Sequence, residues 1–106
     1  MAARDRYENP LVERYCSREM SRLFSPDVKF RTWRRLWIAL AEAEHELGLP
    51  VSRAQISQMK RSAEKINYAA AERFERELRH DVMSHVKAFG LQAPKAAPII
   101  HLGATS

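Results

Sequence analysis

The stretch from Ser25 to Gly48 constrains the fold most, because it has a helix start, a helix stop and an apolar period between them. Ser25, Pro26 and Asp27 supply a hydroxyl N-cap, a proline at the first helical position and an acid in the first turn. Gly48 suits the residue just past a helix end. The apolar positions that follow the i, i+3, i+4, i+7 template are Phe30, Trp33, Trp37, Leu40, Ala41 and Leu47. This pattern predicts a helix that runs to about Leu47.

The charges of this predicted helix oppose its macrodipole. Cations occupy the first half and carboxylates the end: Lys29, Arg31, Arg34 and Arg35, then Glu42, Glu44 and Glu46. Each exposed charge at the unfavourable end of a helix costs about 0.3–1 kcal/mol. We therefore infer that some of these charges pair with groups outside the helix, for which another domain or subunit is a candidate.

The segments on either side are also predicted to be helical, because the three glycines and five prolines fall between periodic stretches. The expected helices are residues 17–24, a helix after a Ser52 cap that carries Ile56 and Met59, and a helix from an Asn67 cap towards Leu78. A bend or break is favoured at Arg79-His80-Asp81, before a further apolar run that ends at Gly90.

Pro94 and Pro98 exclude a long helix after Gly90, and residues 99–102 are predicted to be extended or buried. The fold class expected is therefore all-α, with a short extended segment at the C-terminal end. A chain of 106 residues forms one domain at most, here residues 1–106.

The composition limits the kinds of binding partner and the cellular compartment that are expected for this protein. The formal charge of +5 favours anionic partners without choosing among nucleotides, nucleic acid and acidic lipid. Cys16 is the single cysteine, so an intrachain disulfide and a cysteine-based metal cluster are excluded. No apolar run approaches the roughly 20 residues that span a bilayer, and the N-terminus lacks a secretory h-region. A cytoplasmic protein with no membrane partner is expected.

The tripeptide Arg79-His80-Asp81 places a forked cation, an imidazole and a carboxylate side by side. Arginine suits phosphate or carboxylate, and an adjacent acid raises or orients an imidazole. Local chemistry alone favours a structural salt-bridge cluster over an acid/base site, because a catalytic role requires a substrate within reach.

Two further segments are candidates for anion binding. Thr105 and Ser106 follow Gly103, and hydroxyls at such a turn cap a following helix or present N–H groups to an anion. Arg14 and Tyr15 place a cation beside a phenol, which suits a phosphoryl or ribose group but is more commonly a solvent-exposed pair.

The other histidines favour structural or solvated positions. His45 lies on the polar side of the long helix, whereas His85 and His101 stand among apolar neighbours. His80 and His85 are five residues apart and share no helical face, so no metal site is predicted. The cations at residues 29–35 raise a nucleic-acid hypothesis, but no helix-turn-helix, RNP-type or zinc-finger pattern accompanies them.

Several of these stretches, taken in order, resemble the adenylosuccinate lyase family of the fumarase/aspartase superfamily. They are Arg14 to Met20, Phe24 to Pro26, Lys29 to Trp37, Ala41 to Glu44, Leu47 to Pro50, Leu78 to Met83, and Pro94-Lys95 leading into His101 to Ser106. The combination of Arg-His-Asp-Val-Met with His-Leu-Gly-Ala-Thr-Ser distinguishes this family from fumarases and argininosuccinate lyases.

The resemblance implies the small N-terminal helical domain of a longer homotetrameric lyase, with each active site assembled from three subunits. Such enzymes eliminate fumarate from adenylosuccinate and from SAICAR in purine synthesis, with no cofactor or metal. It also implies that the principal general-acid histidine, the catalytic serine and the central helical bundle lie beyond Ser106. The chain alone is therefore expected to be inactive.

The resemblance assigns roles to the candidate residues and reverses the local preference at His80. It implies that Arg14 and Tyr15 contact the phosphate end of the nucleotide and that Thr105 and Ser106 donate to the succinyl carboxylates. The resemblance also implies that residues 79–81 form a substrate-binding wall, with His80 near the phosphate and assisting the acid/base chemistry. The alternatives are a free-standing helical interaction module without catalysis and a basic nucleic-acid-binding domain.

Overall fold

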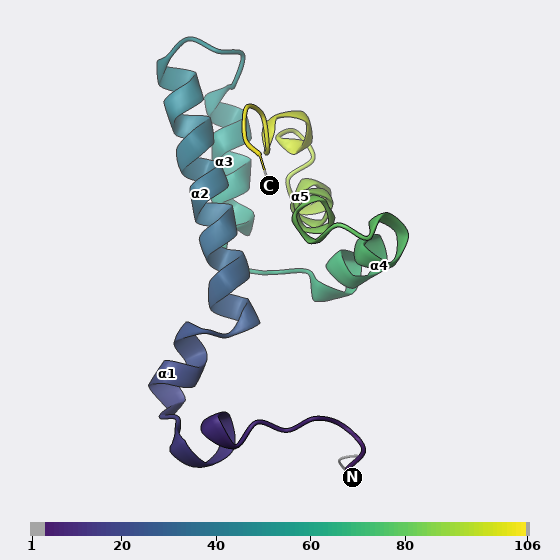
Figure 1. Ribbon diagram of the computed structural model, residues 1–106. Coiled ribbons are helices and arrows are strands. Elements are labelled where there is room, and N and C mark those ends of the chain that lie inside the picture. Colours follow the sequence, from purple (N-terminus) through teal and green to yellow (C-terminus); the bar gives the residue numbers. More distant parts are fainter. Residues whose placement is uncertain (1–3, 106) are drawn as a thin grey trace.

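The computed structural model describes residues 4–105, and every regular element in that range is helical (Figure 1). The elements are a π-helical turn η1 (Leu11–Tyr15), α1 (Arg18–Leu23), α2 (Pro26–Glu46), α3 (Arg53–Ser62), α4 (Tyr68–Leu78), α5 (Asp81–Gln92) and a 3-10 turn η2 (Ala97–Ile99). The all-α prediction is confirmed. No helix in the described range is long and apolar enough to cross a membrane.

Each α-helix begins at a side-chain cap. The capping residues are Ser17, Ser25, Ser52, Asn67 and His80, and each accepts a hydrogen bond from the backbone N–H three residues later. Ser52 and Gln55 form a reciprocal capping box. The long helix ends as predicted, because Gly48 adopts φ +82°, a conformation that glycine tolerates without strain.

α2 and α3 lie side by side and α5 packs across them (Figure 1). The core consists of Trp37, Ile38, Ala41, Val51, Ile56, Met59, Ala63, Val86, Phe89, Ala93, Ala96, Ile99 and Ile100. Trp37 stacks on Phe89 with ring centroids 6.3 Å apart. The sequence groups Leu47 with the apolar face of the long helix, but it is 80% exposed, because at 100° per residue it falls on the side of α2 away from the buried Trp37 and Ala41.

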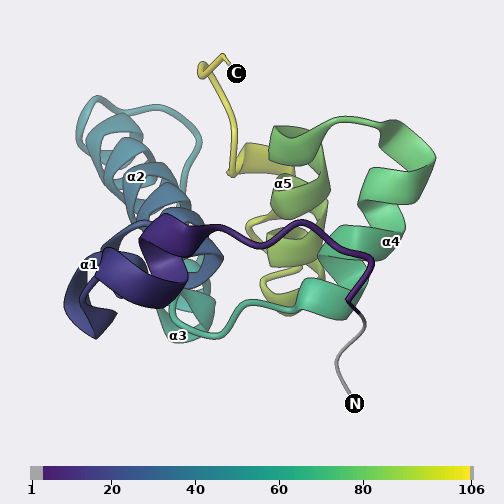
Figure 2. The ribbon, with the colours of Figure 1, turned by 60° about the horizontal axis from the view of Figure 1, so that its bottom comes forward.

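The predicted break between α4 and α5 is confirmed. Arg79 adopts φ 53°, which ends α4, and His80 then caps α5. The two helices fold back on each other, with Phe74 packed against a small cluster of buried alanines from both. Figure 2 shows the turn that joins them.

The sequence predicts that residues 99–102 are extended or buried. The structure shows that the first two residues of this segment are buried and that it is not extended. Ile99 and Ile100 are buried where the chain turns through η2. Gly90 allows the close approach, since a Cβ there would lie 3.1 Å from Ala97 Cβ. A 3-10 turn places both isoleucines in the core, which an extended strand with alternating sides does not do.

Candidate functional site

The Arg79-His80-Asp81 segment lies at the junction of α4 and α5. His80 Nδ1 accepts a hydrogen bond from the Met83 N–H at 3.2 Å. Asp81 is the first residue of α5, and its Oδ1 accepts from the Val82 N–H at 2.9 Å. Among the described residues no ion pair joins Arg79 to Asp81. The segment therefore acts as a helix start and not as an internal salt-bridge cluster.

Ser84 and Glu75, which the sequence analysis did not single out, form hydrogen bonds next to His80. Ser84 is 1% exposed, and its Oγ lies 2.6 Å from the His80 carbonyl oxygen and 3.1 Å from Glu75 Oε2. Ser84 and Glu75 thereby tie the start of α5 to the last turns of α4. The only signal in the sequence is a serine four residues after a cap, a position from which a hydroxyl can reach back to the carbonyl.

A groove of about 350 Å³ adjoins Asp81. It is lined by Pro26, Phe30, Tyr68, Ala71, Glu72, Glu75, Asp81, Ser84 and His85. His85 stacks on Phe30 with ring centroids 3.7 Å apart and an interplanar angle of 15°. Burial, with a contribution from the Arg34 charge, lowers the pKa of His85 below 6.5, so this imidazole is neutral at pH 7. The predicted structural role of His85 is confirmed.

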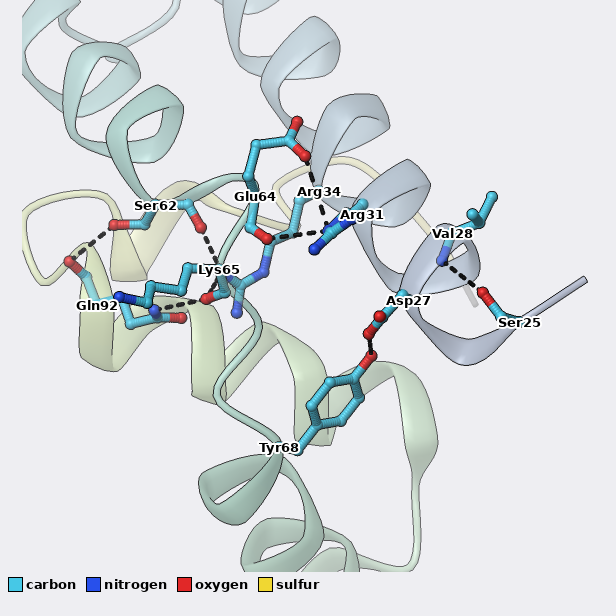
Figure 3. A network of polar contacts seen from close by, with 10 residues as sticks. All are labelled: Ser25, Asp27, Val28, Arg31, Arg34, Ser62, Glu64, Lys65, Tyr68 and Gln92. Atoms are coloured by element: carbon cyan, nitrogen blue, oxygen red, sulfur yellow. Dashed lines mark hydrogen bonds and ion pairs between the residues drawn. The ribbon is translucent and has the colours of Figure 1, made fainter. Parts of the chain in front are cut away.

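Tyr68 closes the same groove by linking the start of α4 to the start of α2. Its hydroxyl donates to Asp27 Oδ1 (Figure 3). Burial and this hydrogen bond raise the pKa of Tyr68 to about 12. The phenol therefore remains a neutral donor at any physiological pH.

Arg34, one of the four cations that raised the nucleic-acid hypothesis, is buried. It is 1% exposed, and its Nη1 donates to the carbonyl oxygens of Ser62 at 2.5 Å and Lys65 at 3.3 Å (Figure 3). The guanidinium also lies over the Phe89 ring at 4.3 Å. Burial lowers the pKa of Arg34 to about 10, which leaves it charged at pH 7.

Two other charges of α2 also pair outside the helix, as the sequence indicated. Arg31 Nε donates to the Glu64 carbonyl oxygen at 3.0 Å, and Glu42 pairs with Lys60 at 2.6 Å. Both partners belong to α3 or to the residues just after it. The inference that α2 charges pair outside their own helix is confirmed for these residues, with the partners inside the same domain.

The prediction for His45 was wrong, whereas His101 stands among apolar neighbours as predicted. His45 is partly buried, and its Nδ1 lies 2.7 Å from the Val51 carbonyl oxygen, so it holds the loop after α2 and is not a solvated surface residue. His101 is partly buried with its ring edge-on to Trp37 at 6.2 Å.

The other candidate binding residues lie apart from His80. Arg14 and Tyr15 are in η1, where the guanidinium lies 5.4 Å from the phenol ring and Tyr15 is 71% exposed. Figure 1 shows η1 beside α1, below the core helices, whereas the C-terminal segment lies beside α3 and α5. Thr105 is exposed after a turn at Gly103, and Ser106 lies outside the described residues.

Comparisons with known proteins give a consistent result. The chain is 50% identical over 96% of its length to an adenylosuccinate lyase of Schistosoma mansoni. It is 51% identical over 96% of its length to that of Saccharomyces cerevisiae, and 49% identical over 94% to that of Schizosaccharomyces pombe. The chain spans about a fifth of the length of these relatives (21%, 22% and 21%). No protein-family model matches it.

Proposed function

Over the residues that it spans, this chain belongs to the adenylosuccinate lyase family, and we propose that it is the N-terminal helical domain of such a lyase. The reaction is elimination of fumarate from adenylosuccinate, which yields AMP, and from SAICAR, which yields AICAR. The observation that carries the proposal is about 50% identity along nearly the whole chain. The enzyme is cytoplasmic and uses no metal or cofactor.

The reaction needs two kinds of group from the protein. A base removes a proton from the carbon beside a succinyl carboxylate, and the C–N bond then breaks to leave fumarate and a protonated purine nitrogen. The charge that builds on the carboxylate requires preorganised donors, and the leaving nitrogen requires an acid. The domain described here supplies binding groups and one titratable side chain.

His80 is the residue with the clearest role. Its Nδ1 accepts from the Met83 N–H, so in the neutral ring the proton resides on Nε2. Nε2–H then serves as the donor to a phosphate oxygen or to the leaving nitrogen. Ser84 bonds to the His80 carbonyl oxygen and to Glu75, which fixes the His80 backbone, and the Met83 N–H orients the ring. Arg79 and Asp81 flank it as the substrate-binding wall.

Arg14, Tyr15, Thr105 and Ser106 complete the proposed set of substrate contacts. Because η1 lies below the core helices and the C-terminal segment lies beside α3 and α5 (Figure 1), we infer that these residues do not meet around one substrate within a single copy. This separation supports a site that different subunits of a homotetramer complete. Arg14 and Tyr15 then bind the phosphate end, and the two hydroxyls bind the succinyl carboxylates.

The nucleic-acid alternative is weakened by the placement of the α2 cations. Arg34 is buried on backbone carbonyls and Arg31 is engaged with Glu64, so the four cations do not form a continuous exposed surface. Phosphate-backbone binding depends on such a surface. The alternative of an interaction module without catalysis predicts the same fold, but it gives the His80 imidazole no catalytic role.

A chimera tests the proposed function. The matching segment of the Saccharomyces cerevisiae enzyme, to which the chain is 51% identical, is replaced by residues 1–106. We expect the chimera to release fumarate from adenylosuccinate, and the isolated chain to release none. A chimera that folds and assembles but does not cleave adenylosuccinate would contradict the proposal.

Variants of the chimera test His80 separately. Asparagine is itself a good N-cap, so His80→Asn keeps the start of α5 while it removes the imidazole. We expect kcat to fall about 10²–10⁴-fold with little change in Tm. Ser52→Ala, which deletes a cap remote from the site, is the matched control and should leave kcat unchanged. Normal turnover of His80→Asn would remove His80 from the chemistry.

A further inference from the structure

The face of α2 that points away from the core carries an apolar stripe. Leu36, Ala39, Leu40, Ala43 and Leu47 recur at helical spacing, and all are exposed except Leu40, which is partly exposed. At 100° per residue they fall on the side opposite the buried Arg34, Trp37, Ile38, Ala41 and Glu44. Figure 1 shows α3 and α5 on one side of α2, with no helix along the other.

Two charges beside this stripe are unpaired. Arg35 and Glu46 are both exposed, and neither makes an ion pair or hydrogen bond with any residue in the range 4–105. They are eleven residues apart, which is about three turns, so they lie on the same flank of the stripe. Arg35 is in the first half of the helix and Glu46 is its last residue.

We propose that this stripe, Leu36 to Leu47, is the contact face between two copies of the chain, with the two α2 helices antiparallel about a two-fold axis near residues 41 and 42. In that arrangement Leu36 of one copy meets Leu47 of the other. Antiparallel helices bring the same flank of each helix together. Arg35 of one copy therefore faces Glu46 of its partner, and the two-fold axis makes this ion pair twice.

The charges select this occupant and orientation. The exposed cation near one end of the stripe and the exposed acid at the other complement an inverted copy of themselves. A parallel pair would place this flank of the two helices on opposite sides of the interface, so Arg35 of one copy would not face Glu46 of the other. The self-pairing also accounts for two charges that oppose the macrodipole of α2 and find no partner in their own chain.

The test is the mass of the 106-residue chain in solution, measured by sedimentation equilibrium over a concentration series. A reductant is included so that Cys16, a free cysteine, cannot cross-link two copies. We expect the mass to rise towards twice 12.3 kDa. A chain that stays monomeric throughout overturns the proposal, and the stripe is then a face for another segment of a longer polypeptide.

Substitutions on the stripe separate this face from the rest of the surface. Leu36→Glu should abolish the dimer, whereas Leu91→Glu, a matched control at an exposed leucine of α5, should leave it intact. Both sites are exposed, so far-UV circular dichroism should show unchanged helicity. Loss of the dimer with Leu91→Glu but not with Leu36→Glu would overturn the proposal.

A charge swap tests the orientation. Arg35→Glu and Glu46→Arg should each weaken association about tenfold, because each turns two attractive contacts into two repulsive ones. The double variant R35E/E46R restores opposite charges across an antiparallel interface and should associate like the original. A double variant as weak as the single ones would exclude the antiparallel pairing.

Discussion

The N-terminal arm (residues 4–24) and the helical core (residues 25–100) use their apolar side chains in opposite ways. The core buries its large apolar residues among α2, α3 and α5. No residue of the arm is buried, and its large apolar side chains are all exposed: Tyr7, Leu11, Val12, Tyr15, Met20, Leu23 and Phe24. Both regions form helices with proper caps, so local helix formation alone does not distinguish them.

This difference in burial indicates which region contributes most to the free energy of unfolding. Burial of a large apolar side chain contributes about 1.5–3 kcal/mol, whereas an exposed one contributes nothing comparable. The core therefore supplies most of the free energy of unfolding, and the arm contributes little to it. The predictions below test this division, from the largest effect to the smallest.

The largest difference in stability is expected between two phenylalanine-to-alanine substitutions, one in the core and one in the arm. Phe89 is 0% exposed between Trp37 and Arg34, so Phe89→Ala should cost about 3–5 kcal/mol of unfolding free energy. Phe24→Ala is the control, since Phe24 is 85% exposed in the arm and its loss should change stability little. Urea denaturation followed by circular dichroism measures both. Equal losses would contradict the division.

The buried guanidinium is the next test. Arg34→Met leaves the Ser62 carbonyl oxygen without its side-chain donor, while the Lys65 carbonyl oxygen keeps the Gln92 Nε2 donor at 2.8 Å, and should destabilise the core by about 1.5–3 kcal/mol. Arg34→Lys should not restore stability, because a lysine ammonium does not reproduce the stacking of the planar guanidinium on Phe89. Arg35→Met, the neighbouring exposed arginine, should change monomer stability by less than about 0.5 kcal/mol.

His85 makes the stability of the core depend on pH. Because its pKa in the folded state lies below 6.5, the unfolded chain binds a proton more readily. Stability is then complete above the unfolded pKa and falls as pH drops below it, by at most about 1.4 kcal/mol per pH unit. His85→Phe should flatten the slope of unfolding free energy between pH 7 and 5. An unchanged slope would mean that His85 is not the group responsible.

The smallest effect compares two serine caps. Ser52→Ala removes a capping box from α3 and should cost about 1 kcal/mol of global stability. Ser17→Ala removes the cap of α1 in the arm and should leave global unfolding unchanged while the α1 amides exchange faster. Hydrogen exchange measures the two regions separately. A global loss with Ser17→Ala would show that the arm is coupled to the core.

Features that depend on neighbouring residues were predictable from the sequence. The start of α2 at Ser25 and its end before Gly48, the caps at Ser52 and Asn67, and the break at residues 79–81 all rest on contacts within about four residues. The candidate segment around His80 was predictable for the same reason. Its support from Ser84 and Glu75 was not, since that required the fold-back of α4 on α5.

The sequence by itself determined the all-helical fold, the boundaries of its main helices and the similarity to adenylosuccinate lyases. The tertiary structure alone decided that Arg34 is buried while Arg35 is exposed, because the carbonyl oxygens that hold Arg34 belong to residues about 30 positions further along the chain. It also decided that His45 holds a loop and that Ile99 lies in a 3-10 turn. Helix formation is local, whereas burial of a charge depends on which distant backbone groups the fold brings to it.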